Sequence, residues 1–318
     1  MGAAAPLVSI PQAPAPPGSR AEWFEGRDGA KLRAALFPAA GDPWGSVVLS
    51  PGRTEPIEKY FETVADLNGR GLMVLAHDWR GQGLSARALP DRLKGHAAGA
   101  DEFMDDYRAL LDTFGPQLPK PWIALGHSMG GCLTLLALIR GEDRFDAAAL
   151  TAPMLGIQLA GVPLPAALAM ASVHKLIGRT GELVMPAYDP LGDLFEADQL
   201  THDRARYDRY KAQLRACPDL AIGAPTWGWV DFALTATAEL ARPGALERVQ
   251  IPVTLISVGE DRLVLNAAAR AAARRLPKGR YVEVEGAYHE ILMETDERRA
   301  LFWAAFDQLL DQVRPPRA

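Results

Sequence analysis

The chain has 318 residues, of which 48% are hydrophobic and 23% charged, and its formal net charge is -5. These proportions are typical of a packed globular protein and exclude a disordered, fibrous or coiled-coil chain, while the length suits one α/β core that carries an insertion. Because the arginines are scattered among acidic residues and form no basic stripe, we expect no nucleic-acid partner.

The first predicted segment is an extended, proline-rich N-terminal tail over residues 1–20. It holds several prolines and no basic residue before Arg20, which is not the pattern of a secretory signal. No uninterrupted apolar run reaches about 18 residues anywhere in the chain, so we expect no transmembrane segment. The two cysteines, Cys132 and Cys217, lie far apart without metal-binding spacing. They indicate neither a disulfide framework nor a metal site, and they favour a cytoplasmic protein.

After the tail, short apolar runs alternate with longer helical patterns, which is typical of βαβ units and a mostly parallel sheet. The predicted strands, the first of them antiparallel, are residues 32–37, 46–50, 73–77, 122–125, 147–151, 253–258 and 281–284. The predicted helices are residues 58–70, 101–114, 132–139, 267–275 and 296–313. Several strands are apolar at every position, which indicates burial on both faces of the sheet.

The alternation stops after residue 152, where strand patterns give way to helical pieces rich in Pro, Trp and Arg. A strand pattern resumes at Ile251, so we predict a helical cap over residues 153–245. This cap is inserted into a core formed by residues 21–152 and 246–318. Within the cap, Trp227 and Trp229 either line a substrate pocket or pack the cap itself.

The motif GHSMG at residues 126–130 follows a predicted strand and opens an apolar helix. A nucleophilic serine projects from a strained turn of this kind, and a glycine on each side lets the neighbouring backbone approach closely. The motif and its context predict that Ser128 is a catalytic nucleophile. The alternative is a glycine-rich turn with a bystander serine.

A serine nucleophile needs a base and a group that orients the base. Asp261 lies in a glycine-containing turn after the strand at residues 253–258, and Glu260 competes for the same role from an earlier position in that turn. His289 lies in the loop between the last predicted strand and the last predicted helix. We therefore predict Ser128, Asp261 and His289 as the catalytic residues.

Acyl transfer also needs backbone N–H groups that stabilise the developing oxyanion. Met129, directly after the nucleophile, is predicted to supply one. The loop at residues 51–55, which reads PGRTE, is expected to supply the other through Arg53, unless it is an ordinary turn. Neither a metal nor an organic cofactor is implied.

These stretches resemble the α/β-hydrolase family and, within it, the branch of lysophospholipases and monoacylglycerol lipases. The likeness rests on PGRTE at 51–55 with EKY at 58–60, on HDWRGQGLS at 77–85, on GHSMGG at 126–131, and on Asp261 with His289. Where monoacylglycerol lipases usually carry His-Gly, this chain has Pro51-Gly52, which is nearer to the bacterial lysophospholipase pattern. The resemblance implies an α/β-hydrolase fold with a helical cap that forms an acyl pocket.

The resemblance further implies a serine hydrolase that cleaves esters of single-chain acyl lipids through an acyl-enzyme, in transient contact with a membrane surface. Gly52, Trp227 and Trp229 are then candidate substrate-binding residues. The Arg53 side chain is interpreted as solvated, with binding of a lipid phosphate as the alternative. Two other functions stay open: a short-chain carboxylesterase or thioesterase on the same catalytic residues, and a non-catalytic ligand-binding protein of the same fold.

Overall fold

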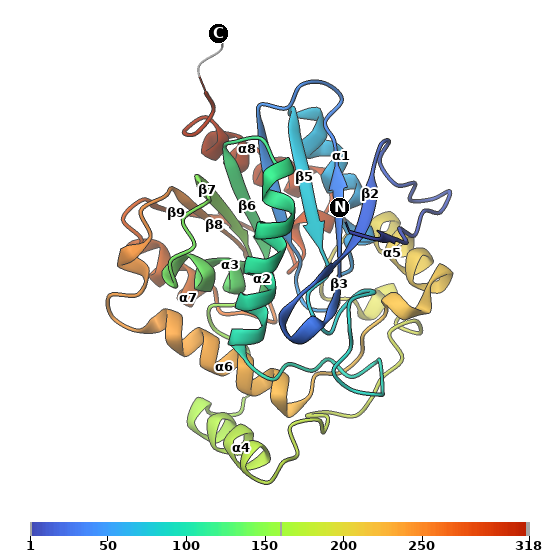
Figure 1. The fold of residues 1–318 in the computed structure, drawn as a ribbon. Coiled ribbons are helices and arrows are strands. Elements are labelled where there is room, and N and C mark those ends of the chain that lie inside the picture. The colour runs from blue at the N-terminus through green and yellow to red at the C-terminus, as the bar shows by residue number, and fades with distance from the viewer. Residues whose placement is uncertain (1, 160, 316–318) are drawn as a thin grey trace.

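The computed structural model describes residues 2–159 and 161–315, which contain one nine-stranded sheet (Figure 1). Across the sheet the strand order is β1-β2-β3-β5-β4-β6-β7-β8-β9. The strands are β1 (Ala4–Ala5), β2 (Arg20–Glu25), β3 (Lys31–Phe37), β4 (Gly45–Ser50), β5 (Leu72–His77), β6 (Trp122–His127), β7 (Ala147–Thr151), β8 (Val253–Val258) and β9 (Gly279–Val284). All neighbours from β5 to β9 pair in parallel, whereas β1, β2, β3 and β5 pair antiparallel. The predicted mostly parallel sheet is confirmed.

The five strands from β4 to β8 are buried at every position, as expected for parallel strands rich in apolar residues and covered on both faces. Both faces of the sheet are covered by helices: in Figure 1, α2 and α3 lie in front of the sheet, while α1 and α8 lie behind it. The helices that accompany the core strands are α1 (Phe61–Gly69), α2 (Ala100–Phe114), α3 (Met129–Ile139), α7 (Asn266–Arg275) and α8 (Asp296–Leu310).

The segment between β7 and β8 contains the remaining long helices, α4 (Leu164–Leu176), α5 (Arg204–Ala216) and α6 (Trp227–Ala241). Helix α4 lies at the lower end of the molecule in Figure 1 and packs against α6. Helix α6 also packs against α3, and its Phe232 ring lies 4.8 Å from the ring of Phe103 in α2, measured between centroids. In the part of the chain described here, no helix is both long and apolar enough to cross a membrane.

The N-terminal segment lies along the core. Strand β1 pairs with β2, and the carbonyl of Pro6 accepts a hydrogen bond of 3.0 Å from Arg33. The Arg33 guanidinium is fully buried between Glu58 and Asp78, at 2.7 Å from each carboxylate. The backbone N–H of Val8 donates to the same Glu58 carboxylate at 3.0 Å. A buried ion cluster of the core is therefore completed by residues of the predicted tail.

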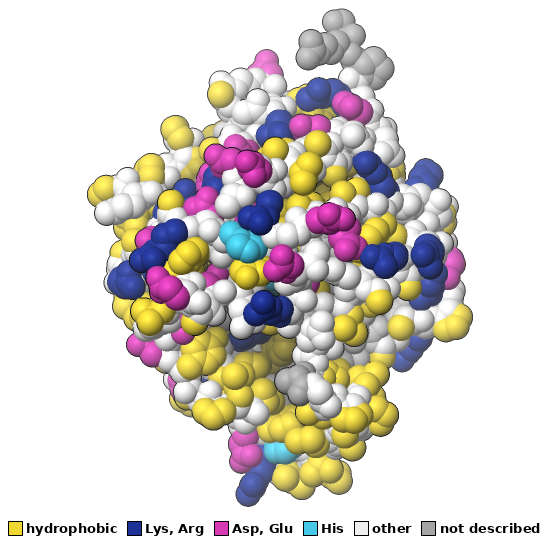
Figure 2. Space-filling view, turned by 180° about the vertical axis from the view of Figure 1, so that it is seen from behind, with side chains coloured by type: hydrophobic (Ala, Val, Ile, Leu, Met, Phe, Trp, Pro, Cys, Tyr) yellow, Lys and Arg dark blue, Asp and Glu magenta, His cyan; other side chains and the backbone are white. Residues whose placement is uncertain are grey.

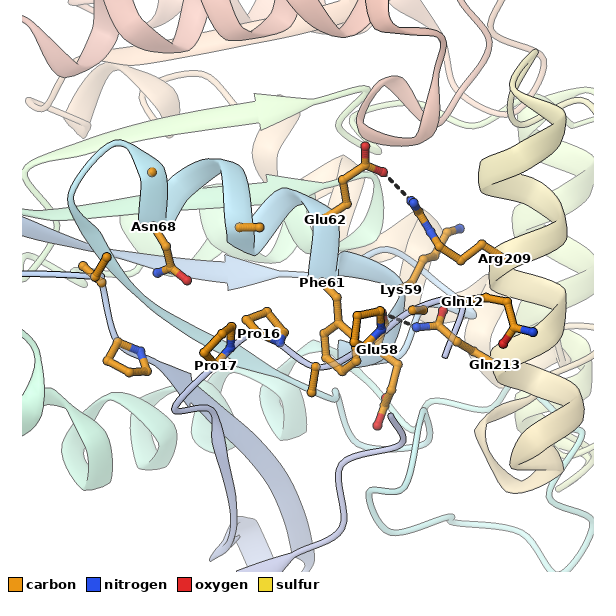
Figure 3. A pocket seen from close by; sticks show the side chains of 18 residues that line it. Gln12, Pro16, Pro17, Glu58, Lys59, Phe61, Glu62, Asn68, Arg209 and Gln213 are labelled. Atoms are coloured by element: carbon orange, nitrogen blue, oxygen red, sulfur yellow. Dashed lines mark hydrogen bonds and ion pairs between the residues drawn. The ribbon is translucent and has the colours of Figure 1, made fainter. Parts of the chain in front are cut away.

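A cavity of about 540 Å³ separates part of this N-terminal segment from α1 and α5 (Figure 3). Pro16 and Pro17 line the cavity from the N-terminal segment, Phe61 lines it from α1, and Arg209 and Gln213 line it from α5. The cavity contains neither the predicted nucleophile nor the predicted histidine.

Candidate active site

Ser128 lies in the sharp turn between the end of β6 and the start of α3. Its backbone has φ 49° and ψ -114°, a strained conformation for a residue with a side chain. The flanking glycines are required by close contacts: a Cβ on Gly130 would lie 2.1 Å from the carbonyl oxygen of Ser50, and one on Gly126 would lie 2.8 Å from that of Gly130. The GHSMG spacing thus has a steric cause in the packing of the turn against β4.

The three predicted catalytic side chains lie together at the carboxyl ends of their strands. His289 Nε2 is 2.9 Å from Ser128 Oγ, and His289 Nδ1 is 2.8 Å from Asp261 Oδ2. The other carboxylate oxygen of Asp261 accepts backbone N–H bonds from Leu263 at 2.8 Å and Val264 at 3.0 Å. Burial acts to raise the pKa of Asp261, but the hydrogen bond from His289 and these two N–H donors outweigh burial and lower the pKa.

Glu260, the competing acid, is exposed, while Asp261 makes the contact with His289. The geometry of the hydrogen bonds therefore favours Asp261 as the residue that orients the imidazole. The structure brings together the serine, aspartate and histidine that the sequence singled out.

The turn at residues 51–55 passes close to the nucleophile. Its Gly52 N–H donates to Glu55 Oε2 at 2.6 Å, and its Thr54 N–H donates to Gln82 Oε1 at 2.5 Å. Between them, the N–H of Arg53 has no hydrogen-bond acceptor among the described residues. Met129 is the first residue of α3, so its N–H has no partner within the helix. Both predicted oxyanion donors are thus free to bind a ligand.

Beneath this turn lies a buried polar cluster that sequence reasoning did not assign to the site. Lys59 Nζ contacts Glu55 Oε1 at 2.9 Å and Glu290 Oε1 at 2.5 Å, and the Tyr60 hydroxyl donates to Glu55 Oε2 at 2.5 Å. The ring of His127 approaches the cluster, with Nε2 at 3.9 Å from Glu55 Oε1. The only local signal was the spacing of Glu55 and Lys59, four positions apart in the stretch used for the resemblance.

The pKa values of the groups in this cluster are set by burial and by the charges of neighbouring groups. Burial acts to raise the pKa of Glu55, but the positive charge of Lys59 outweighs it and lowers the pKa to about 2. Burial and the nearby Glu55 charge raise the pKa of Glu290 to about 7, against the opposing effect of Lys59. Burial lowers the pKa of His127 to about 4, so this imidazole is neutral at physiological pH.

A pocket of about 440 Å³ opens onto Ser128 and His289. Gly52 and Trp229, two of the candidate substrate-binding residues, line it together with Arg53, whereas Trp227 does not. The Trp227 ring instead stacks on that of His174 with 4.2 Å between centroids, which fits the alternative that this tryptophan packs the cap. The apolar lining comes from both sides of the pocket: Met154, Ile157, Met185, Leu200, Leu263 and Val264.

The Arg53 side chain is less solvated than the sequence suggested. Its Nη1 donates to the carbonyl of Gly223 at 2.8 Å, and its guanidinium carbon lies 5.5 Å from the centre of the Trp229 ring. No carboxylate among the described residues forms an ion pair with it. Within the same residues, no group of three or more His, Cys, Asp or Glu side chains is arranged to hold a metal ion.

Comparison with known proteins identifies the family. Residues 41–296 match the family model described as serine aminopeptidase, S33. The chain belongs to this S33 family. It is 34% identical over 314 residues to lysophospholipase L2 of Escherichia coli (strain K12), an alignment that covers 92% of this chain and 88% of the relative.

Further relatives of this S33 protein include the monoacylglycerol lipase of Mycolicibacterium smegmatis, which is 26% identical, with 87% of this chain and 92% of the relative covered. Among solved structures, a soluble variant of monoglyceride lipase from Saccharomyces cerevisiae, in complex with a substrate analog, superposes with a TM-score of 0.73. That match has 20% identity and covers 92% of this chain and 95% of the other, so it shows the shared fold. The predicted resemblance to α/β-hydrolases of the lysophospholipase and monoacylglycerol lipase branch is confirmed, and with it the assignment to hydrolases.

Proposed function

We propose that this S33 protein is a serine hydrolase that cleaves the carboxylic ester of single-chain acyl lipids, either lysophospholipids or monoacylglycerols. The observation that carries the proposal is the continuous hydrogen-bonded series Ser128–His289–Asp261 beside a pocket with a largely apolar lining. The relatives named lysophospholipase and monoacylglycerol lipase support this substrate class.

In the proposed reaction, Ser128 Oγ attacks the ester carbonyl while its proton passes to His289 Nε2, 2.9 Å away. The Asp261 carboxylate holds the imidazole with its remaining proton on Nδ1 and stabilises the imidazolium that forms. The free N–H groups of Met129 and Arg53 are the proposed donors to the oxyanion. The proton on Nε2 then goes to the leaving alcohol, and a water molecule, activated by the same imidazole, releases the fatty acid from Ser128.

The pocket suits one acyl chain. Its volume of about 440 Å³ lies within the usual range for small-molecule sites, roughly 300 to 1,000 Å³. Met185, Tyr188 and Leu200, all from the segment between β7 and β8, contribute to its wall. This contribution supports the proposal that residues 153–245 act as a cap over the nucleophile and form part of the acyl site.

Arg53 favours a lysophospholipid among the candidate lipids. Its guanidinium carries a positive charge that no carboxylate of the described residues balances, and Arg53 is one of the residues that line the pocket containing Ser128. A phosphodiester is a strong acceptor for such a group. A monoacylglycerol offers no charge for the guanidinium to bind.

We also propose transient contact with a membrane surface and a cytoplasmic location. The first is supported by exposed apolar side chains on and beside α4, such as Leu164, Val173 and Leu176, which is 87% exposed. Figure 2 shows apolar side chains gathered at the lower end of the molecule, where Figure 1 places α4. The second is supported by Cys132 and Cys217, which are both free thiols.

A substrate panel with the purified protein tests the proposal. Lysophosphatidylcholine and a monoacylglycerol with the same acyl chain are compared with p-nitrophenyl butyrate, a short-chain acyl thioester and an aminoacyl p-nitroanilide. We expect the highest kcat/KM on the single-chain lipids, and loss of both this activity and fluorophosphonate labelling in Ser128→Ala. Turnover confined to the short esters or thioesters would instead favour the short-chain alternative, and tight lipid binding without turnover would favour a non-catalytic role.

A further inference from the structure

The two turns that carry the proposed oxyanion donor Arg53 and the base His289 are joined by a single buried ammonium group. Glu55 ends the first turn, and Glu290 follows His289 directly in the second. Lys59 contacts both carboxylates, and its side chain is only 1% exposed, against 3% for Glu55 and 8% for Glu290. Water is therefore largely excluded from both contacts.

On the first turn, the hydrogen bonds of Glu55 restrain the backbone around Arg53. One carboxylate oxygen takes the Gly52 N–H and the Tyr60 hydroxyl, and the other takes Lys59 Nζ. Lys59 Nζ also lies 4.5 Å from the centre of the Tyr210 ring, whose hydroxyl donates to the carbonyl of Thr54 at 2.7 Å. The direction of the Arg53 N–H is thus set by groups that meet at Lys59.

On the second turn, Glu290 is fixed at both its backbone and its side chain. Its N–H donates to the carbonyl of Leu200 at 2.8 Å, and its Oε1 receives Lys59 Nζ. Because Glu290 is bonded to His289 through one peptide unit, a shift of this carboxylate displaces the backbone from which the imidazole projects. The same ammonium group therefore restrains both turns.

Stability alone is a poor explanation for this cluster. One buried ammonium group contacts two buried carboxyl groups, and the cost of removing such ionisable groups from water commonly equals or exceeds their mutual attraction. Apolar side chains of similar volume would pack the same space at lower cost. Placement of the reacting groups is a better explanation, because displacement by about 1 Å reduces rates on the order of 10²-fold.

We propose that Lys59 is a positioning residue. Through Glu55 and Glu290, it keeps the Arg53 N–H and the His289 imidazole correctly placed relative to Ser128. The inference rests on the proposed acyl-transfer function. It adds a requirement that the catalytic side chains do not reveal, namely that the oxyanion side and the base side of the site are fixed by one shared contact.

The first test is Lys59→Met, which keeps an unbranched side chain only one atom shorter and removes its charge. We expect kcat for ester hydrolysis, and the rate at which a fluorophosphonate labels Ser128, to fall about 10- to 100-fold, while KM stays within about threefold. The control is Arg140→Met, which removes another cation that contacts two carboxylates at 2.7 Å, those of Asp101 and Glu239, at the end of α3. All rates are compared well below the unfolding temperature of each variant.

A second pair of variants decides the question if Lys59→Met does not fold. Glu290→Gln keeps an oxygen that accepts from Lys59, whereas Glu290→Ala removes it. We expect Glu290→Gln to label at least about ten times faster than Glu290→Ala, although both keep the fold by circular dichroism. Equal labelling rates in this pair, or rates in Lys59→Met no lower than in Arg140→Met, would overturn the proposal.

Fluorophosphonate labelling also distinguishes a failure of the proposed substrate class from a failure of the proposed role of Lys59. If the wild-type protein is labelled at Ser128 but hydrolyses no lipid ester, the proposed substrate class fails while the labelling rates still decide the role of Lys59. If the wild-type protein is not labelled at all, both the proposed function and the role of Lys59 are overturned.

Discussion

Replacement of Asp261 by asparagine should be far more damaging than its small change in shape suggests. The asparagine must place its amide oxygen where Oδ1 now accepts the N–H groups of Leu263 and Val264, at 2.8 and 3.0 Å. The amide NH₂ then faces His289 Nδ1, which now lies 2.8 Å from Oδ2. Because NH₂ can only donate, the imidazole carries its proton on Nε2 and cannot accept the proton of Ser128.

The size of the effect follows from how firmly the amide is held. A flipped amide would set NH₂ against two N–H donors and leave both unpaired, which costs about 2 to 6 kcal/mol in total. The productive orientation is then disfavoured by roughly 30- to 10⁴-fold. With the loss of the carboxylate charge added, we expect kcat/KM for Asp261→Asn to fall about 10³- to 10⁴-fold, equivalent to about 4 to 5 kcal/mol in the activation barrier.

The assay is hydrolysis of a monoacylglycerol, together with fluorophosphonate labelling, which needs no assumption about the natural substrate. Glu260→Gln is the matched control, because it makes the same chemical change on an exposed neighbour, and it should retain wild-type rates. Asp261→Ala forces no tautomer, so we expect it to be less impaired than Asp261→Asn. Retention of more than a tenth of wild-type kcat/KM by Asp261→Asn would refute this account of the histidine.

Three further predictions concern the scaffold. Gly130→Ala would place a Cβ 2.1 Å from the carbonyl oxygen of Ser50, so we expect loss of folded protein, whereas Gly69→Ala, with no atom within 4 Å, should be neutral by thermal unfolding. Burial lowers the pKa of His77 to about 3, so the unfolded state takes up a proton first, and stability should fall between pH 6.5 and 4 by about 3 kcal/mol. Urea unfolding of His77→Gln should show a correspondingly smaller decline, and an unchanged decline would contradict this assignment. Phe302→Ala, at a fully buried position of α8, should lower the unfolding free energy by about 3 to 5 kcal/mol without changing the rate of Ser128 labelling per folded molecule.

The core of the fold could be predicted because its signals are local. All seven predicted strands are present, and β4 to β8, which are rich in apolar residues, are buried at every position. Strands β1 and β2 were not predicted. β1 has only two residues, and β2, which reads RAEWFE, has charged residues at three of its six positions and alternates poorly. Their pairing depends on contacts with β3 and within the N-terminal segment, and a short stretch of sequence does not reveal such contacts.

In the site, too, residues with a local sequence pattern could be predicted, whereas contacts between distant segments could not. Ser128 was predicted from five adjacent residues, and Asp261 and His289 from their positions after late strands. The Lys59 cluster was not predicted, because its contact with Glu290 joins positions 231 residues apart and depends on two turns that meet only in the folded chain. The sequence left open whether Trp227 and Trp229 line the pocket or pack the cap, because two residues so close in a helix project in different directions: Trp229 lines the pocket, and Trp227 meets His174.

The contact between the N-terminal segment and Arg33 sets a practical limit on trimming the gene for protein production. A chain that starts after Val8 lacks the carbonyl of Pro6 and the amide of Val8, so two polar groups of a sealed ion cluster lose their partners and solvent gains a route to them. Shortened versions should therefore express poorly even though every proposed catalytic residue is retained. Affinity tags are better placed after the final helix, α8, which ends at Leu310.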